Sequence, residues 1–293
     1  MTAQAKARAG SGGGCCRALL PWALVALSLL LCRPAQASQP QDWIVGAPRE
    51  GSFLNLDLIF GGAQMGVEHR LPVYGGSNML TLRGSALAAL PFGSSQVDLD
   101  FRVLNLTLGM SLGAQDTWRN QRFAPGEPTH RKERRQREAA GEFDSDVFAF
   151  WEGRASLAFP FNDYVVLNHL TTWRKSGAAP GSFDNLSNVV HDGDRVSTDF
   201  QLFFKHRDFG ALAPTFQLLH YPDQGNWKTQ LNYGFLFVTR AGLTQRDDVL
   251  LWQMYFHTGP VFGGGVDNRD EYGAAFLRGP LTLLLAYRSV IEL

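Results

Sequence analysis

The stretch LTLLLAYRSVIEL, from Leu281 to Leu293, alternates apolar and polar side chains almost to the carboxyl terminus. In an extended strand Thr282, Arg288 and Glu292 would lie on one face. The opposite face would be apolar, with only Ser289 interrupting it, and would carry Leu281, Leu283, Leu285, Tyr287, Ile291 and Leu293. A strand that is apolar on one side and charged on the other suits a wall between lipid and a polar lumen.

The same period of two recurs along the chain. Leu54, Leu56 and Leu58 alternate with Asn55 and Asp57. Similar runs occupy residues 63–73, 80–86, 97–108, 196–204, 212–221, 229–240, 249–258 and 272–293. No helical period of 3.6 competes with them. The sequence therefore predicts an all-β fold, a closed antiparallel transmembrane β-barrel of about 12 strands, within roughly 10–14.

The alternation changes phase near Asn105. Before this point the apolar residues are Val97, Leu99, Phe101 and Val103, and after it they are Leu104, Leu106 and Leu108. One extra residue in a strand shifts the phase in this way, so we interpret the change as a β-bulge.

Two longer segments without alternation, at about 113–145 and 175–194, are predicted to be long loops on one side of the barrel. Membrane barrels usually have short periplasmic turns and long outer loops. A first strand at Gly51 with a turn at 278–280 would put both long segments on the periplasmic side. A first strand around Trp43, with Tyr272 to Leu293 as one bent strand, puts both outside, and we prefer this register. Its periplasmic turns would be 61–62, 91–95, 160–163, 206–210 and the turn near Gly242.

Residues 1–37 have the three parts of a secretory signal peptide. Basic residues precede an apolar run from Ala18 to Leu31, and Ala35-Gln36-Ala37 is a small-residue cleavage site. The apolar run is shorter than the roughly 20 residues of a membrane-spanning helix. We therefore expect cleavage, leaving residues 38–293 as a single barrel domain. All three cysteines lie in the removed segment, so neither a disulfide nor a thiolate site is expected.

The expected mature chain has 23 basic and 27 acidic residues. This balance argues against nucleic acid as a partner. We also find no cluster of histidine, cysteine and carboxylate residues at metal-ligand spacing, so the sequence predicts neither a metal nor another cofactor.

The strand from Leu281 to Leu293 resembles the terminal strand of bacterial outer-membrane β-barrel proteins, which are porin-like, although those usually end in an aromatic residue and this chain ends in Leu293. The resemblance implies the outer membrane of a Gram-negative cell envelope. It also implies that the barrel-assembly machinery engages the terminal strand, and that outer-membrane lipid and glycolipid surround the barrel. It points to no specific family and leaves the oligomeric state open.

The inferred inner face carries charges of both signs in equal number. A strongly ion-selective pore would be expected to show an excess of one sign. Balanced charges can instead pair across neighbouring strands. The predicted lumen-facing residues are Asp57, Glu68, Arg70, Arg83, Asp98, Asp100, Arg102, Glu152, Arg154, Asp199, Lys205, Arg240, Arg288 and Glu292.

The first long loop contains a basic run, Arg131, Lys132, Arg134, Arg135 and Arg137. If the loop faces outward, these cations could meet the phosphates of glycolipid; otherwise they form a solvated charge run. The outer face is rich in aromatic residues, as expected of girdles at the membrane interfaces: Trp43, Trp151, Tyr233, Phe235, Phe237, Trp252 and Phe256.

Enzymatic readings find little support in the sequence. A serine or threonine nucleophile needs a base and an orienting group. The nearest candidates are His169 with Thr171, and His257 beside Thr258. We therefore predict no catalytic residues and a passive porin-like channel or a structural barrel that displays surface loops. The alternatives are a lipid-modifying outer-membrane enzyme, of phospholipase or lipid A deacylase type, and a soluble exported β-sandwich or lipocalin-like binder.

Overall fold

A computed structural model describes residues 49–59, 62–73, 78–89, 92–120, 122, 136–179, 181–184, 189–191, 193–206, 209–223, 226–240, 248–262 and 281–293. The predicted signal peptide and Trp43 lie outside this part of the chain. The strands are β1 (Gly51–Ile59), β2 (Gly62–Pro72), β3 (Met79–Ala89), β4 (Phe92–Val103), β5 (Leu106–Asn120), β6 (Asp144–Pro160), β7 (Val165–Ser176), β8 (Ser182–Asp184), β9 (Val189–His191), β10 (Asp194–His206), β11 (Gly210–Asp223), β12 (Asn226–Arg240), β13 (Val249–Phe262) and β14 (Leu281–Glu292).

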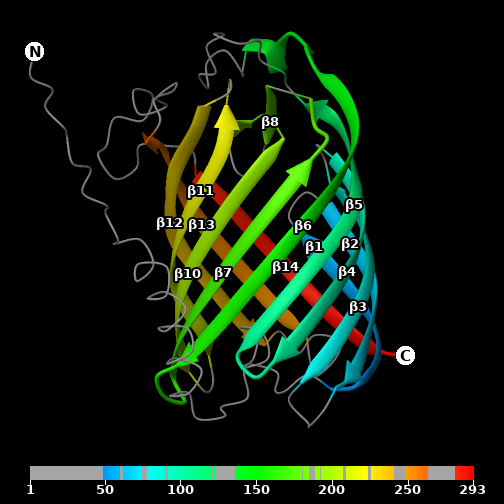
Figure 1. Ribbon diagram of the computed structural model, residues 1–293, viewed down its shortest axis with the longest axis vertical. Coiled ribbons are helices and arrows are strands. Elements are labelled where there is room, and N and C mark those ends of the chain that lie inside the picture. The colour runs from blue at the N-terminus through cyan, green and yellow to red at the C-terminus, as the bar shows by residue number, and fades with distance from the viewer. Residues whose placement is uncertain are drawn as a thin grey trace, which may run out of the picture. The chain divides into compact units, whose positions relative to one another are not determined.

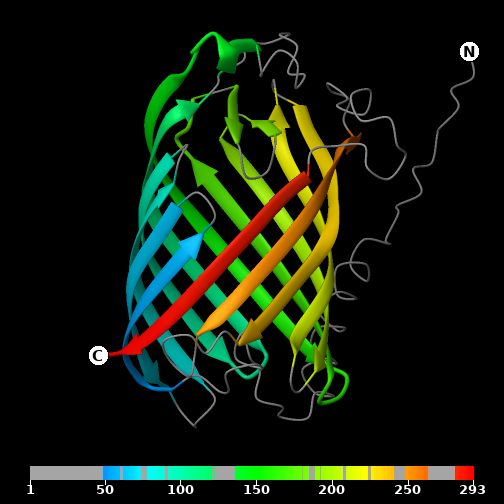
Figure 2. The ribbon, with the colours of Figure 1, turned by 180° about the vertical axis from the view of Figure 1, so that it is seen from behind.

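Twelve of these strands form a closed antiparallel barrel, in the order β1-β14-β13-β12-β11-β10-β7-β6-β5-β4-β3-β2 (Figure 1). The predicted fold class is thereby confirmed. Closure occurs between β14 and β1, where Asp57 pairs with Arg288 and Phe53 with Glu292. Figure 2 shows these first and last strands side by side. The terminal strand therefore closes against Gly51–Ile59, and its predicted closure against a strand around Trp43 is wrong.

The two faces of the wall differ in the way that a period of two requires. Side chains such as Leu58, Val97 and Leu112 point outward and are 59%, 54% and 58% exposed. The residues that point inward include Asp57 and Asp98, which are 6% and 0% exposed. The barrel thus has an apolar outer face and a polar inner face.

The predicted bulge near Asn105 is wrong, because a tight hairpin turn at Leu104 and Asn105 separates β4 from β5. Val103 pairs directly with Leu106 across this turn. Leu104 has a φ of 51°, in the left-handed region that side chains other than glycine rarely adopt. Its backbone N–H donates to Asn78 Oδ1 at 3.2 Å, which supports the turn. The change of phase therefore marks a reversal of the chain.

This hairpin also alters which turns share an end of the barrel. We call the end where β1 begins and β14 finishes the terminus end, and the opposite end the loop end. The sequence predicts that the turns at 61–62 and near 91 lie at the same end of the barrel as those at 160–163, 206–210 and near Gly242. This prediction is wrong, because it does not include the reversal at residues 104–105. The first two turns lie instead at the loop end, while the other three lie at the terminus end.

Both predicted long segments fall at the loop end, as does the connection between β13 and β14. β5 extends to Asn120 and β6 starts at Asp144, so the first connection is residues 121–143. The second contains the hairpin of β8 and β9 (Figure 1). The backbone of β9 comes close to β11, and that of β8 to β5. Since three strands separate β5 from β11 in the barrel, this hairpin extends over part of the lumen mouth.

Candidate functional site: the inner face of the barrel

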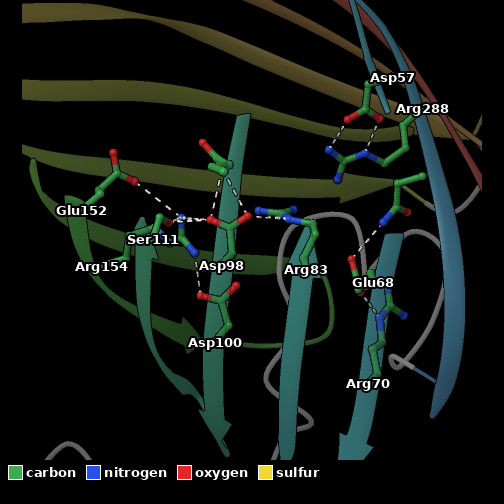
Figure 3. A network of polar contacts seen from close by, with 12 residues as sticks. Asp57, Glu68, Arg70, Arg83, Asp98, Asp100, Ser111, Glu152, Arg154 and Arg288 are labelled. Carbon is green, nitrogen blue, oxygen red and sulfur yellow. Dashed lines mark hydrogen bonds and ion pairs between the residues drawn. The ribbon is translucent and has the colours of Figure 1, made fainter. Parts of the chain in front are cut away.

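The centre of the charged inner wall is Asp98 on β4, whose carboxylate is fully buried. Arg83 on β3 donates through Nε to Asp98 Oδ2 at 2.9 Å, and Arg154 on β6 donates through Nη1 to Oδ1 at 3.1 Å (Figure 3). The Ser111 hydroxyl also donates to Oδ1, as does the Gln96 amide. Two arginines and two neutral donors thus satisfy one buried carboxylate, as burial of a charge requires.

Arg154 links three strands of this wall. Its Nη2 donates to Asp100 Oδ1 at 2.8 Å, and Glu152 Oε1 lies 3.5 Å from its Nη1. The guanidinium reaches β4 by passing over Gly109 of β5. A Cβ at Gly109 would lie 2.0 Å from Asp100 Oδ1 and 3.0 Å from Arg154 Nε. Glycine at this position therefore leaves the space that the ion pair occupies.

A second group of ion pairs lies where the barrel closes. Arg288 on β14 donates to both oxygens of Asp57 on β1, through Nε at 2.6 Å and Nη2 at 2.8 Å. On β2, Glu68 pairs with Arg70 and accepts from Asn55 Nδ2 at 3.0 Å (Figure 3). The bidentate pair ties the first strand to the last.

These ion pairs run along the wall. Each joins residues of one strand, of neighbouring strands, or, for Arg154, of strands on either side of β5. The side chains of Arg83, Arg154 and Arg288 remain 24%, 19% and 31% exposed. Among the described side chains, none of these ion pairs joins one wall of the barrel to the opposite one. The described ion pairs therefore run along this wall and do not connect it to the opposite wall.

The opposite wall has neutral polar groups around one carboxylate. Gln230 and Asn232 on β12, Gln217 on β11 and Asp199 on β10 form a chain of hydrogen bonds. Gln230 Nε2 donates to Asn232 Oδ1 at 2.7 Å, and Asn232 Nδ2 donates to Gln217 Oε1 at 2.7 Å. Gln217 Nε2 in turn donates to Asp199 Oδ1 at 2.8 Å. The amide side chains thus orient one another, and the chain of hydrogen bonds ends at the carboxylate of Asp199.

Below this chain, toward the terminus end, the same wall becomes apolar. A cluster of inward side chains that are at most 5% exposed comprises Phe203, Ala211, Ala213, Leu236, Val238 and Val249. Leu251 packs against it. This sector of the inner face is a packed core that anchors strands β10 to β13 to one another.

The fourteen predicted lumen residues all share the strand phase of the inner face. Nine belong to the two groups of ion pairs, and Asp199 ends the amide chain. Arg102 is 8% exposed and inward. Toward the terminus end lie Lys205, Arg240 and Glu292; Glu292 forms an exposed pair with Arg49 at 3.7 Å. The structure brings together the charges of the two ion-pair groups and leaves these three apart from them.

Other predicted residues lie outside the lumen or outside the described part of the chain. Of the basic run, only Arg137 is described; its Nη1 donates to the Arg122 carbonyl at 2.8 Å. The remaining four basic residues, Arg131, Lys132, Arg134 and Arg135, are outside the described residues. His169 faces outward, with Nε2 3.3 Å from Thr171 Oγ1 and its ring 4.9 Å from that of Phe200. The side chains of His257 and Thr258 are not among those described.

The predicted outer aromatics lie on the outer face where they are described. Trp151 packs edge-on against Trp173 at 4.6 Å, and Tyr233 stacks on Phe256 at 5.5 Å. Phe235 and Trp252 are each 47% exposed. These rings add to the apolar outer face of the barrel.

Sequence reasoning missed three inward cations near the loop end: Arg174 on β7, Arg195 on β10 and Lys228 on β12. Arg174 is the last residue before the predicted loop at 175–194, and Arg195 and Lys228 each stand one residue before the predicted runs that start at Val196 and Thr229. The signal was present, because each continues the inward phase of its strand. The runs predicted from Val196 and Thr229 therefore start too late, since β10 begins at Asp194 and β12 at Asn226.

No family model and no curated protein matches this chain. Solved structures similar to it include the KdgM porin in complex with disordered oligogalacturonate (4% identity, 82% of this chain and 96% of that one, TM-score 0.36). OccAB1 of Acinetobacter baumannii is another, at 11% identity over 79% of this chain and 57% of that one, with a TM-score of 0.38. A third is LpxR from Salmonella typhimurium, at 8% identity over 83% of this chain and 99% of that one, with a TM-score of 0.37. Structural similarity this low says nothing about the activity of this chain, so its activity has to be inferred from its own geometry.

Proposed function

We propose that this protein is an outer-membrane β-barrel that acts as a passive channel for small polar solutes. The observation that carries the proposal is that the charges of the inner face pair along the wall and leave the arginine side chains partly exposed to the lumen. A barrel built only as a solid support would fill its centre with side chains from opposite walls, and ion pairs between those walls would then be expected.

Three features support placement in an outer membrane. The outer face presents large apolar side chains over most of the wall. Lipid tolerates sheet only when it is closed, and this sheet is closed. The longest connections lie together at the loop end, as expected of the extracellular side of such barrels. A soluble β-sandwich or lipocalin-like binder would instead have to expose this apolar face to water.

The hairpin of β8 and β9 limits the size of the solutes in this proposal. It lies in the connection at the loop end and approaches both β5 and β11. A side-chain-lined barrel of about 12 strands narrowed in this way suits solutes the size of single sugars, amino acids or small organic ions.

Uptake into proteoliposomes tests the function. Vesicles that contain the barrel should swell in isotonic glucose or glycine, because these solutes pass through the lumen, and should swell far more slowly in a large dextran. Vesicles prepared without protein serve as the control. Swelling no faster than in these controls would refute the channel and leave the structural, loop-displaying barrel.

A lipid-modifying enzyme has one observation in its favour, the contact of His169 with Thr171 on the outer face. Such a pair needs a third group to orient the histidine. The ring neighbour of His169 is Phe200, which cannot accept a proton. Release of fatty acid from phospholipid or glycolipid that disappears in His169→Ala would establish this alternative, and we expect none.

A further inference from the structure

We propose that a groove on the outer face of β14, β1, β2 and β3 binds one acyl chain of a zwitterionic phospholipid. The proposal rests on the membrane placement in the proposed function and does not depend on conduction through the lumen. Figure 2 shows β14, in red, beside β1, in blue, on this side of the barrel.

The groove lies where outward side chains on neighbouring strands are small. Ala63 on β2 pairs with Ala88 on β3, and Ala86 lies two residues from Ala88 on the same face. Ser289 on β14 also points outward, yet it is only 6% exposed. The groove that these residues line has a volume of about 570 Å³, which lies within the range of about 300–1,000 Å³ that is common for ligand pockets.

Large side chains stand beside these small ones. Leu58 pairs with Ala63 and Met65 pairs with Ala86, and both large side chains are 59% exposed. Tyr287 pairs with Leu58, and its hydroxyl donates to Asp248 Oδ2 at 2.6 Å, which orients the ring. A chain lying in the groove therefore contacts protein atoms at its sides as well as beneath it.

An acyl chain suits this groove because the groove is continuous with the lipid-facing wall of the barrel. No hydrophobic driving force brings apolar groups together within lipid, so association depends on van der Waals contacts. These contacts increase in number when protein surrounds a chain on several sides. The groove should therefore hold a chain longer than a row of uniformly large side chains does, such as Val97 and Leu112, which pair directly with each other.

The length of the groove matches one leaflet of a bilayer. Tyr287 and Ile291 both line it and are four residues apart, which corresponds to about 13 Å along a strand. Half of a hydrocarbon core of about 30 Å is about 15 Å. Leu58, Ala63 and Ala88 lie near the loop-end limits of their strands, so the polar end of the lipid would lie at the membrane surface on that side.

The charge of the lining favours a zwitterionic headgroup. Among the described residues that line the groove, the one carboxylate is Asp57, which binds Arg288 through both oxygens, and none is a cation. The connections from β1 to β2 and from β3 to β4 are Phe60-Gly61 and Leu90-Pro91, which are uncharged. A glycolipid with several phosphates would be expected to need cations beside them, whereas a zwitterionic phospholipid does not.

Photolabelling in lipid vesicles tests the site. The barrel is refolded into phosphatidylcholine vesicles that contain a trace of phosphatidylcholine with a diazirine in one acyl chain. After irradiation, mass spectrometry measures the label on Met65 and Tyr287 in the groove, and on Leu112 elsewhere on the outer face. Ala86→Phe puts a ring into the groove, so it should lower the label on Met65 and Tyr287 at least about threefold and leave that on Leu112 unchanged.

Ala114→Phe is the matched control. Ala86 pairs with Ser95 and Ser95 with Ala114, so Ala114 lies in the same row of the outer face but outside the groove. The added ring should leave the label on Met65 unchanged. Heat-modifiable migration checks folding, and Ala63→Leu, expected to lower the label about twofold or more, replaces Ala86→Phe if that variant does not fold.

Other occupants of the groove give different results. Unlabelled phosphatidylcholine should displace the label from the groove more effectively than an equal amount of lipid A, and the reverse order would overturn the choice of a phospholipid. A barrel that migrates as a dimer and takes no label on Met65 would show that a second copy covers the groove, which would also overturn the proposal.

The outcomes separate the site from the channel. Label that is lost from the groove in Ala86→Phe, in a barrel that does not conduct, would keep the site and refute the channel. A conducting barrel in which Ala86→Phe leaves the label on Met65 unchanged, or lowers it no more than Ala114→Phe does, would overturn the site and leave the channel standing.

Discussion

Arg154 on β6 lies 3.1 Å from Asp98 on β4, although β5 runs between the two strands. The contact is possible because β5 presents Ser111 and Gly109 beneath the guanidinium. Ser111 joins it by accepting from Nη1 at 2.6 Å, and Gly109 leaves room for the pair with Asp100. The charged wall is therefore held together over three strands by one arginine.

Gly109→Ala should destabilise the barrel by about 1–3 kcal/mol. The new methyl group would overlap the Arg154–Asp100 pair and leave partly buried charges without their best partners. Urea titration of the barrel in lipid vesicles measures this loss. Gly84→Ala is the control, because a Cβ there meets nothing within 4 Å, and its effect should stay within about 0.5 kcal/mol. Equal effects of the two substitutions would contradict this role for Gly109.

Asp57→Asn should weaken the closure of the barrel by about 1–3 kcal/mol, because it leaves Arg288 without its bidentate partner. The charge-swapped double variant Asp57→Arg/Arg288→Asp should recover part of that loss, and urea titration of all four forms gives the coupling energy. If the double variant is as unstable as the sum of the two single variants, the pair does not contribute to closure.

Glu292→Gln provides a comparison with an exposed pair at the terminus end. Arg49 and Glu292 lie 3.7 Å apart with side chains 54% and 63% exposed. Pairs of this kind contribute little in water, so stability should change by less than about 0.5 kcal/mol. A loss of stability as large as that of Asp57→Asn would mean that the position of an ion pair in the barrel, and not its burial, decides how much it contributes to the free energy of unfolding.

Phe203→Ala should lower the free energy of unfolding by about 3–5 kcal/mol, because this side chain is fully buried in the apolar cluster of the inner face. Phe204→Ala removes the same ring from the outer face, where it is 47% exposed, and should cost clearly less. Urea titration of both variants compares the two faces at adjacent positions. A larger loss for Phe204→Ala would contradict the assignment of faces in β10.

The period of two made the fold and the facing of residues predictable. A residue such as Asp98 that alternates with Val97 and Leu99 can face the lumen only if they face outward. The ion-pair partners could not be predicted from the sequence. The contact of Arg154 with β4 across β5 depends on Gly109, and β5 must first be placed in register before that contact can be seen.

The hairpin at Leu104 and Asn105 escaped prediction for a different reason. Its first residue adopts a left-handed φ without being glycine, so the usual signal of a tight turn is weak. The phase shift was visible but has two explanations, a bulge or a reversal. Each hairpin reverses the end of the barrel at which all later turns lie. Interpreting the phase shift as a bulge therefore put the turns at 61–62 and near 91 at the same end as the later turns, which is wrong.

Single-channel recording tests the central claim most directly. The chain without its predicted signal peptide, residues 38–293, would be refolded in detergent and added to a planar lipid bilayer in KCl. We predict stepwise increases in current as single barrels insert, since in the proposed channel the wall charges line a water-filled lumen. Bilayers that show no steps at any applied voltage, with protein that is folded by its heat-modifiable migration, would contradict the channel.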